Sequence, residues 1–122
     1  MLFEKRVVQK LFKKLCAQSQ CTFPQHRQLL NAPKEPGVYV IRKGRVVLHV
    51  GRTPRGKGGL HQRLKNHLHG SSSFTREYLN GMGANLRTGH TYQYLLVRNP
   101  RQRALLEAYA VATLCPKHIG VG

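Results

Sequence analysis

The spacing of apolar residues along the chain predicts several helices. From residue 3 to 18, apolar side chains fall three or four positions apart among lysines and arginines, which is typical of an amphipathic basic helix. Residues 60 to 69 carry a leucine at every fourth position and predict another helix. A third helix is predicted from residue 74 to 82, with Ser73 as its N-terminal cap.

Runs of β-branched and aromatic residues predict the strands. Residues 38 to 41 and 46 to 50 are two such runs on either side of a basic tip that contains Gly44, and together they predict a β-hairpin. Residues 91 to 97 form a further run and predict another strand.

A last helix is predicted from residue 101 to 114, opened by Pro100. From residue 104 on it is nearly all apolar, and Glu107 is the only charge in that part. A helix that is apolar on all sides is a buried one, and a buried carboxylate is costly unless a cation compensates it. Two interpretations stay open: an ion pair with Arg103 one turn earlier, or a ligand to a metal ion.

At 122 residues, the chain is long enough for one modest hydrophobic core. Its 21 lysines and arginines face only four acidic residues, so the net charge is +17. Such an excess attracts polyanions, and nucleic acid is the expected partner. A membrane surface would also attract the chain, but no apolar run approaches the roughly 20 residues of a spanning helix, so we expect no membrane protein.

The acidic residues are few enough to exclude one class of enzyme. The chain has no aspartate, and its glutamates are Glu4, Glu35, Glu77 and Glu107. A nuclease with two metal ions needs several carboxylates that converge on the paired cations. Metal chemistry in this chain would therefore depend on a single glutamate.

The cysteines indicate a reducing environment. There are three, Cys16, Cys21 and Cys115, an odd number that does not suit a disulfide framework. The first residues lack the apolar core of a signal peptide, and we expect a cytoplasmic protein. Cys16, Cys21 and His26 lack the second pair of ligands that a zinc site needs, so buried or free thiols are preferred.

A glycine-rich basic loop follows the hairpin, from residue 52 to 59. Its backbone amides and its cations, Arg52, Arg55 and Lys57, can approach phosphates closely. We interpret the loop as a contact to nucleic acid, together with Lys65 on the next helix. A mobile loop without this role is the alternative.

Five features in a fixed order carry the candidate chemistry. Gly37-Val38-Tyr39 and His49-Val50-Gly51 lie on the two hairpin strands, Arg63 and His67 share one side of the following helix, and Glu107 lies on the last helix. In this order the residues resemble the GIY-YIG endonuclease family, over residues 36 to about 116. Either tripeptide alone is a weak signal, whereas the ordered set is specific.

The resemblance implies the fold class α+β, with a small three-stranded antiparallel sheet flanked by helices and an additional N-terminal helix. It divides the chain into an N-terminal helical extension, residues 1–35, and a GIY-YIG-like nuclease domain, residues 36–122. Within the extension, residues 18 to 35 keep no sustained apolar period. We expect a connection there, with a short helix near residues 26 to 30.

The resemblance also implies hydrolysis of DNA phosphodiester bonds with one divalent cation, Mg²⁺ or Mn²⁺. Glu107 would hold the cation, which polarises the phosphate and stabilises the leaving oxygen. Arg63 would bind nonbridging phosphate oxygens in the transition state. Tyr39 would orient or deprotonate the attacking water, and His67 would support the proton transfer or clamp the phosphate.

The chain departs from the family in two places. His49 stands where the family usually has tyrosine, and it is either a base that titrates near neutral pH or a structural side chain of the hairpin. Residues 115 to 120 contain no asparagine, where the family often has one after a proline. Shared chemistry requires Tyr39 and His49 on one face, so we expect a bulged hairpin tip that pairs them. A tight two-residue turn would argue against His49 as a catalytic group.

The leading hypothesis is a DNA endonuclease, and the alternative is a DNA- or RNA-binding module that keeps the scaffold with weak or no catalysis. Charge does not separate them, because phosphate attraction serves both. A basic ribosome-associated protein is a third, weaker interpretation. No zinc finger or helix-turn-helix is recognisable, so we expect structure-selective or nonspecific binding by a monomer or weak dimer.

Overall fold

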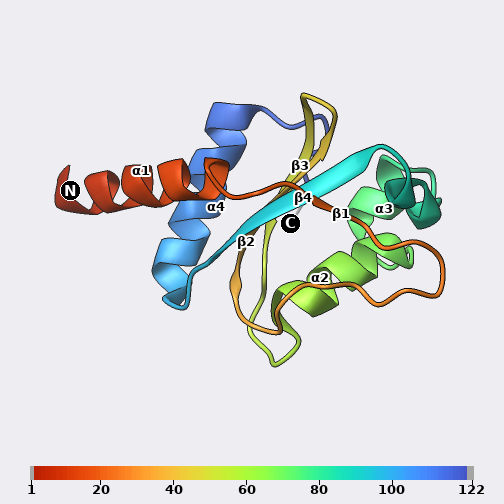
Figure 1. Cartoon of the computed structure of the whole chain (residues 1–122). Helices are drawn as coiled ribbons and strands as arrows, with labels where there is room; N and C mark the ends of the chain where they lie inside the picture. The colour runs from red at the N-terminus through yellow and green to blue at the C-terminus, as the bar shows by residue number, and fades with distance from the viewer. Residues whose placement is uncertain (1, 121–122) are drawn as a thin grey trace.

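The computed structural model describes residues 2–120 and places a sheet between two layers of helices (Figure 1). The elements in chain order are α1 (Leu2–Cys16), β1 (Cys21–Thr22), β2 (Gly37–Lys43), β3 (Val46–Arg52), α2 (Gly59–Leu68), α3 (Ser73–Glu77), the 3-10 helix η1 (Gly83–Arg87), β4 (His90–Leu96) and α4 (Pro100–Leu114). Helices α1 and α4 pack on one face of the sheet, while α2, α3 and η1 pack on the other (Figure 1).

The sheet is antiparallel, with the strand order β1-β4-β2-β3. The expectation of an antiparallel sheet flanked by helices is confirmed, but the count of three strands is wrong, because the described chain has four. The extra strand, β1, is only two residues long and pairs with β4, with Cys21 opposite Tyr92. So short a strand leaves no alternation in the sequence to detect.

Two expected helices differ from the structure. No helix forms near residues 26 to 30, where the chain makes a turn. The helix expected from 74 to 82 is the much shorter α3, and its cap is Ser72 rather than Ser73, because the Ser72 hydroxyl accepts the hydrogen bond from the Thr75 amide. The 3-10 helix η1 has no counterpart among the expected elements.

The tip of the hairpin also differs from the expected one. We expected a bulged tip that pairs Tyr39 with His49, whereas residues 44 and 45 form a tight two-residue turn. Tyr39 pairs with Gly51 instead. The predicted pairing is therefore wrong.

A bulge further along the hairpin nevertheless brings Tyr39 and His49 to one face. Beyond the pair Ile41–His49 the register shifts by one residue, so β3 carries Leu48 as an extra residue. Leu48 and His49 are neighbours in sequence, yet both are buried on the side of the sheet that holds Tyr39. The tight turn alone would put His49 on the opposite face from Tyr39. The bulge returns both side chains to one face, so His49 can still share a site with Tyr39.

Strand β2 is buried on both sides, because helices cover both faces of the sheet. Tyr39 and Ile41 lie in the core under α2, whereas Val38 and Val40 lie in the core under α1 and α4. A nearly continuous apolar run of this kind is typical of a strand between two layers.

The first 35 residues contribute to both cores. Leu15 of α1 is buried in the core that contains α4, and Phe23 and Leu30 are buried in the core under α2. The boundary at residue 35 stays a prediction. Packing nevertheless ties this extension to the remainder of the chain on both faces of the sheet.

Helix α4 is less buried than its apolar sequence suggests. One face packs on the sheet, with Leu106 and Ala110 fully buried, while other sides of the helix are partly exposed. The expectation of a helix buried all round is wrong, because α4 covers the outside of the sheet. Within residues 2–120, none of the helices has the length and apolar character needed to cross a bilayer.

Gly51 makes room for Tyr39 across the hairpin. A Cβ atom on residue 51 would lie 2.3 Å from the Tyr39 hydroxyl oxygen, far inside van der Waals contact. We expect Gly51→Ala to lower the free energy of unfolding, measured by urea denaturation, by about 1–3 kcal/mol, because the buried ring has to move. Gly120→Ala is the control, since its added Cβ meets nothing closer than 3.8 Å. An equal loss in both variants would contradict this explanation.

Candidate active site

A cavity of about 400 Å³ opens between β3, α2, α4 and the C-terminal segment. Three of the five sequence candidates, His49, Arg63 and Glu107, line it. Tyr39 and His67 are fully buried in the core beside His49, with ring centroids 6.0 and 5.1 Å from that imidazole. The fold therefore brings the candidates together in two groups, three on the cavity wall and two behind it.

The Glu107 carboxylate is turned toward the hairpin. Its Oε1 accepts a hydrogen bond from Arg52 at the end of β3 (3.2 Å), and 27% of its side chain is exposed. Burial raises the pKa of Glu107, and the nearby Arg52 and Arg63 guanidinium groups oppose this rise. The interpretation as an ion pair with Arg103 is wrong, because Arg103 donates to backbone carbonyl groups just after β3 and β4 instead.

Glu107 is the one residue on the described cavity wall that offers a carboxylate to a hard divalent cation. Among the described residues that line the cavity it is the only acidic one, and residues 2–120 contain no group of three His, Cys, Asp or Glu side chains that could hold a metal ion. A cation here would take one protein carboxylate and complete its oxygen shell with water and phosphate. Cys16, Cys21 and Cys115 form no disulfide bond in the described part of the chain.

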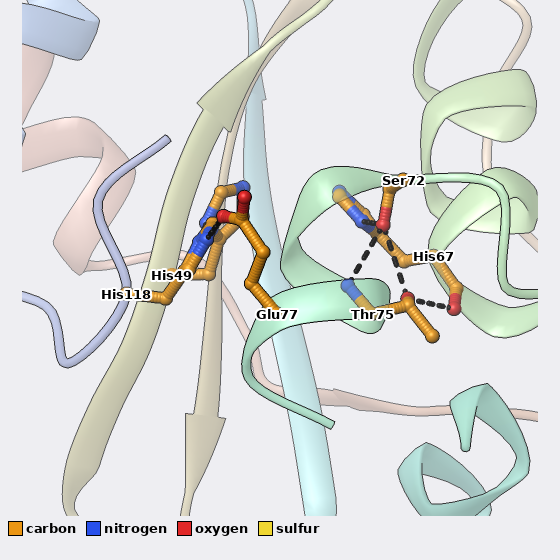
Figure 2. Close-up of polar contacts among 6 residues, drawn as sticks. All are labelled: His49, His67, Ser72, Thr75, Glu77 and His118. Atoms are coloured by element: carbon orange, nitrogen blue, oxygen red, sulfur yellow. Dashed lines mark hydrogen bonds and ion pairs between the residues drawn. The ribbon is translucent and has the colours of Figure 1, made fainter. Parts of the chain in front are cut away.

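A chain of buried hydrogen bonds sets the protons around Tyr39 and His67. Thr75 Oγ1 donates to the backbone carbonyl of His67 (2.5 Å), so it accepts from Ser72 Oγ (3.0 Å). Ser72 has then used its only proton and accepts from His67 Nδ1 (2.6 Å; Figure 2). Burial keeps the pKa of His67 well below its usual range, and the neutral ring accepts the Tyr39 hydroxyl proton at Nε2 (2.5 Å).

Tyr39 is therefore a donor in a closed network. Burial raises its pKa to about 12 and outweighs the opposing effect of the nearby Arg63 guanidinium. The phenol keeps its proton at neutral pH and directs it toward His67. This geometry does not favour the expectation that Tyr39 deprotonates the attacking water.

His49 is the sequence-predicted imidazole on the cavity wall. Its ring stacks on Phe74, with centroids 4.7 Å apart, and its Nδ1 lies 3.2 Å from Nδ1 of His118. Its Nε2 is buried and has no hydrogen-bond partner within residues 2–120. Burial lowers the pKa of His49 to about 3, with further contributions from His118 and Arg63, so the ring is uncharged at neutral pH.

Arg63 supplies a complementary unpaired group. Its Nε is a buried N–H donor without a partner in the described part of the chain. Buried polar atoms without partners are rare in folded proteins, and an unseen water, ion or ligand is a common explanation. His49 and Arg63 both line the cavity, and each leaves one buried nitrogen without a partner in the described chain.

His118 and Glu77 were not identified as site residues from the sequence. His118 lines the cavity, and its Nε2 lies 2.8 Å from Glu77 Oε1 (Figure 2). No spacing in the sequence connects residues 49, 77 and 118. The one available signal is the scarcity of acids, which makes Glu77 one of only four carboxylate side chains.

The candidates for nucleic-acid contact lie in different settings. Arg55 and Lys57 are exposed on the loop between β3 and α2, and a groove lined by Arg55 and Arg63 runs under this loop. Arg52 is exposed but engaged by Glu107. Lys65 is exposed on α2 and faces a separate hollow. Arg63 thus connects the cavity to the basic loop.

The arrangement of strands, helices and cavity defines a known class of fold. No protein-family model matches the chain, and no curated protein matches it by sequence. By structure, the chain has the fold of the GIY-YIG endonuclease domain. The family resemblance of the sequence is thereby confirmed at the level of the fold.

Two solved structures illustrate the similarity. One is the N-terminal GIY-YIG endonuclease domain of UvrC from Thermotoga maritima, bound to its catalytic divalent cation, magnesium. It is 24% identical in sequence, and the match covers 74% of this chain and 89% of that chain with a TM-score of 0.55. A point mutant of the same domain, bound to its catalytic divalent cation, is 21% identical, with coverage of 92% and 97% and a TM-score of 0.53. At this identity the likeness establishes the fold alone.

The buried neutral histidines make stability depend on pH. In the unfolded chain His49 and His67 titrate near pH 6.5, whereas folding lowers the pKa of both, to about 3 for His49. Below about pH 6.5 the unfolded state therefore binds more protons. We expect the free energy of unfolding to fall by up to about 1.4 kcal/mol per pH unit for each histidine as the pH is lowered, measured by urea denaturation at pH 7 and pH 5.

His49→Gln removes one of these titrating groups and should reduce the loss of stability between pH 7 and pH 5. His26→Gln is the matched control, because His26 is exposed and lies outside the buried cluster. The same pH dependence in wild type and in His49→Gln would show that His49 is not buried in its neutral form.

Proposed function

We propose that this chain is an endonuclease that hydrolyses DNA phosphodiester bonds with a single divalent cation, Mg²⁺ or Mn²⁺. The observation that carries the proposal is the composition of the cavity wall, where the Glu107 carboxylate, the Arg63 guanidinium and the neutral His49 imidazole come from three distant segments. The similar solved structures are endonuclease domains bound to a catalytic divalent cation, which supports the same chemistry here.

Glu107 is the residue that would hold the cation. When bound, the cation polarises the scissile phosphate and stabilises the charge that develops on the leaving oxygen. Arg63 binds the nonbridging phosphate oxygens, because it lines the cavity and its planar donors match phosphate geometry. The Glu107 carboxylate therefore binds the cation, and the Arg63 guanidinium binds the phosphate.

His49 accepts the proton of the attacking water. The ring is neutral and lines the cavity, and its Nε2 is free of other partners in the described chain. Tyr39 and His67 support it from behind, because their hydrogen bond ties β2 to α2 and so fixes Arg63 relative to His49. With a pKa of about 3, His49 is a weaker base than the near-neutral titration expected from the sequence, and its contribution is that it stays uncharged and able to accept a proton at neutral pH.

The charge of the chain supports a nucleic-acid substrate. A net charge of +17 attracts the phosphate backbone of any polynucleotide. Arg55 and Lys57 on the exposed loop extend this attraction from the cavity along the groove that Arg63 shares. We propose DNA as the substrate, and cleavage of RNA is the alternative outcome.

A nucleic-acid-binding module without catalysis is the second candidate function. It is favoured by His49 in place of the usual tyrosine and by the absence of asparagine from residues 115 to 120. Both candidates bind through the same charge, so only a cleavage assay separates them.

We expect Glu107→Gln to lower cation-dependent cleavage at least about a hundredfold, because an uncharged amide holds Mg²⁺ poorly and a bound cation is worth several kcal/mol in the transition state. Plasmid nicking in Mg²⁺ or Mn²⁺ measures the rate. Glu35→Gln is the matched control, since it changes a half-exposed carboxylate that pairs with Arg98. Cleavage by Glu107→Gln at the wild-type rate would refute the role of Glu107, and binding without cleavage by the wild type would favour the binding module.

We also expect the double variant Arg55→Ala and Lys57→Ala to weaken DNA binding and to reduce the slope of log affinity against log salt by about 2, one for each phosphate that the loop no longer neutralises. Fluorescence anisotropy at several salt concentrations measures both quantities. Lys10→Ala is the control for a change of charge alone, because Lys10 is exposed on α1, across the sheet from the loop. Half the effect from this single substitution would show that the loop makes no localised contact.

A further inference from the structure

We propose that His49, His118 and Glu77 form a proton relay that carries the proton of the attacking water from the cavity to the protein surface. The relay rests on the proposed nuclease function and concerns the fate of the proton that His49 accepts. His49 is the catalytic residue in this scheme, while His118 and Glu77 act through it.

The three side chains form one continuous line of hydrogen bonds (Figure 2). Nδ1 of His49 lies 3.2 Å from Nδ1 of His118, and Nε2 of His118 lies 2.8 Å from Glu77 Oε1. Both imidazoles are buried, whereas 54% of the Glu77 side chain is exposed. The line therefore runs from the cavity wall to solvent.

The donors and acceptors along the line set the starting positions of the protons. The Glu77 carboxylate only accepts, so His118 donates its Nε2 proton to it. The relay requires that His118 rests as the neutral ring, which then accepts at Nδ1 and makes His49 the donor through its own Nδ1. His49 consequently carries its lone pair on Nε2, the atom without a partner in the described chain. This is the form that can take a proton from water.

The transfer balances in protons and electrons. An O–H bond of the attacking water breaks, its proton bonds to Nε2 of His49, and the electron pair on the oxygen forms the new bond to phosphorus. The bond from phosphorus to the leaving 3′ oxygen breaks, and its electron pair goes to that oxygen. The Nδ1–H bond of His49 breaks and its proton bonds to Nδ1 of His118, which becomes an imidazolium. The Nε2–H bond of that imidazolium then breaks, its proton bonds to Glu77 Oε1, and the exposed carboxyl group releases it to solvent.

The placement of charge explains why the proton is passed on. A positive charge on His49 would be buried and would lie near the Arg63 guanidinium, and these surroundings hold the pKa of His49 low. On His118 the same charge has a carboxylate oxygen 2.8 Å away. The inner ring is therefore neutral before and after the transfer.

The backbone fixes His118 beside His49. The amides of Lys117 and His118 donate to the carbonyls of Val47 and Leu48 at 3.1 and 2.9 Å. These bonds lie along β3 at the bulge that turns His49 toward the cavity. One short stretch of β3 thus positions both imidazoles.

Single-turnover cleavage kinetics of Glu77→Gln and His118→Phe test the relay. We expect each substitution to lower the cleavage rate constant about tenfold or more, because a positioned base commonly contributes about a hundredfold or more, while DNA affinity stays at the wild-type value. Glu35→Gln is the control, as an equivalent change of a half-exposed carboxylate outside the relay. Rate constants for Glu77→Gln that equal those of the control would overturn the relay, and this surface variant keeps the test valid if His118→Phe does not fold.

A second readout does not depend on activity. Nitrogen-15 NMR of the histidine side chains shows which ring nitrogen carries the proton. We expect wild-type His49 to be protonated at Nδ1 and to shift toward the Nε2-protonated form in His118→Phe. Protonation of wild-type His49 at Nε2 would overturn the relay even in an active nuclease. The expected tautomer supports the proton arrangement whether or not cleavage occurs, so failure of the nuclease proposal is recognised separately.

Discussion

The hydrogen bond between Tyr39 and His67 is the contact on which the site depends. It joins β2 to α2 inside the core, and Ser72 and Thr75 extend it to the first turn of α3. Every member of this network is hydrogen-bonded and His67 is neutral, so its burial carries no penalty for unpaired polar groups. A rigid joint between sheet and helix results. His49 on the sheet and Arg63 on α2 both line the cavity, and this joint fixes the distance between them.

Elements with a strong local pattern could be predicted from the sequence. The apolar periods of α1, α2 and α4 and the β-branched runs of the hairpin and β4 placed these elements to within one or two residues. The errors concern features that distant contacts decide. The strand β1 exists only because β4 offers it an edge, and the exposure of α4 follows from its place outside the sheet. The hairpin combines a two-residue turn with a bulge at Leu48, and this register puts Tyr39 opposite Gly51, where a side chain would not fit.

The ordered motif predicted which side chains gather, but it could not predict how they divide between the cavity and the core. His49, Arg63 and Glu107 reach the cavity, whereas Tyr39 is enclosed, because the bulge at Leu48 and the absence of a side chain at Gly51 settle those directions. The partner of Glu107 was also out of reach, since it comes from a strand rather than from its own helix. Residues His118 and Glu77 lie 41 positions apart, and only the folded chain shows their contact.

The position of the C-terminal segment has a consequence for solubility. Strand β3 lies at the outer end of the sheet, and an uncovered strand of this kind exposes amides and carbonyls that recruit other chains. Two main-chain bonds from Lys117 and His118 occupy part of that border. The segment therefore covers part of the edge at which another strand could pair. Proteolysis before Lys117 would expose the edge of β3 to pairing with other chains. The same cut would also remove His118.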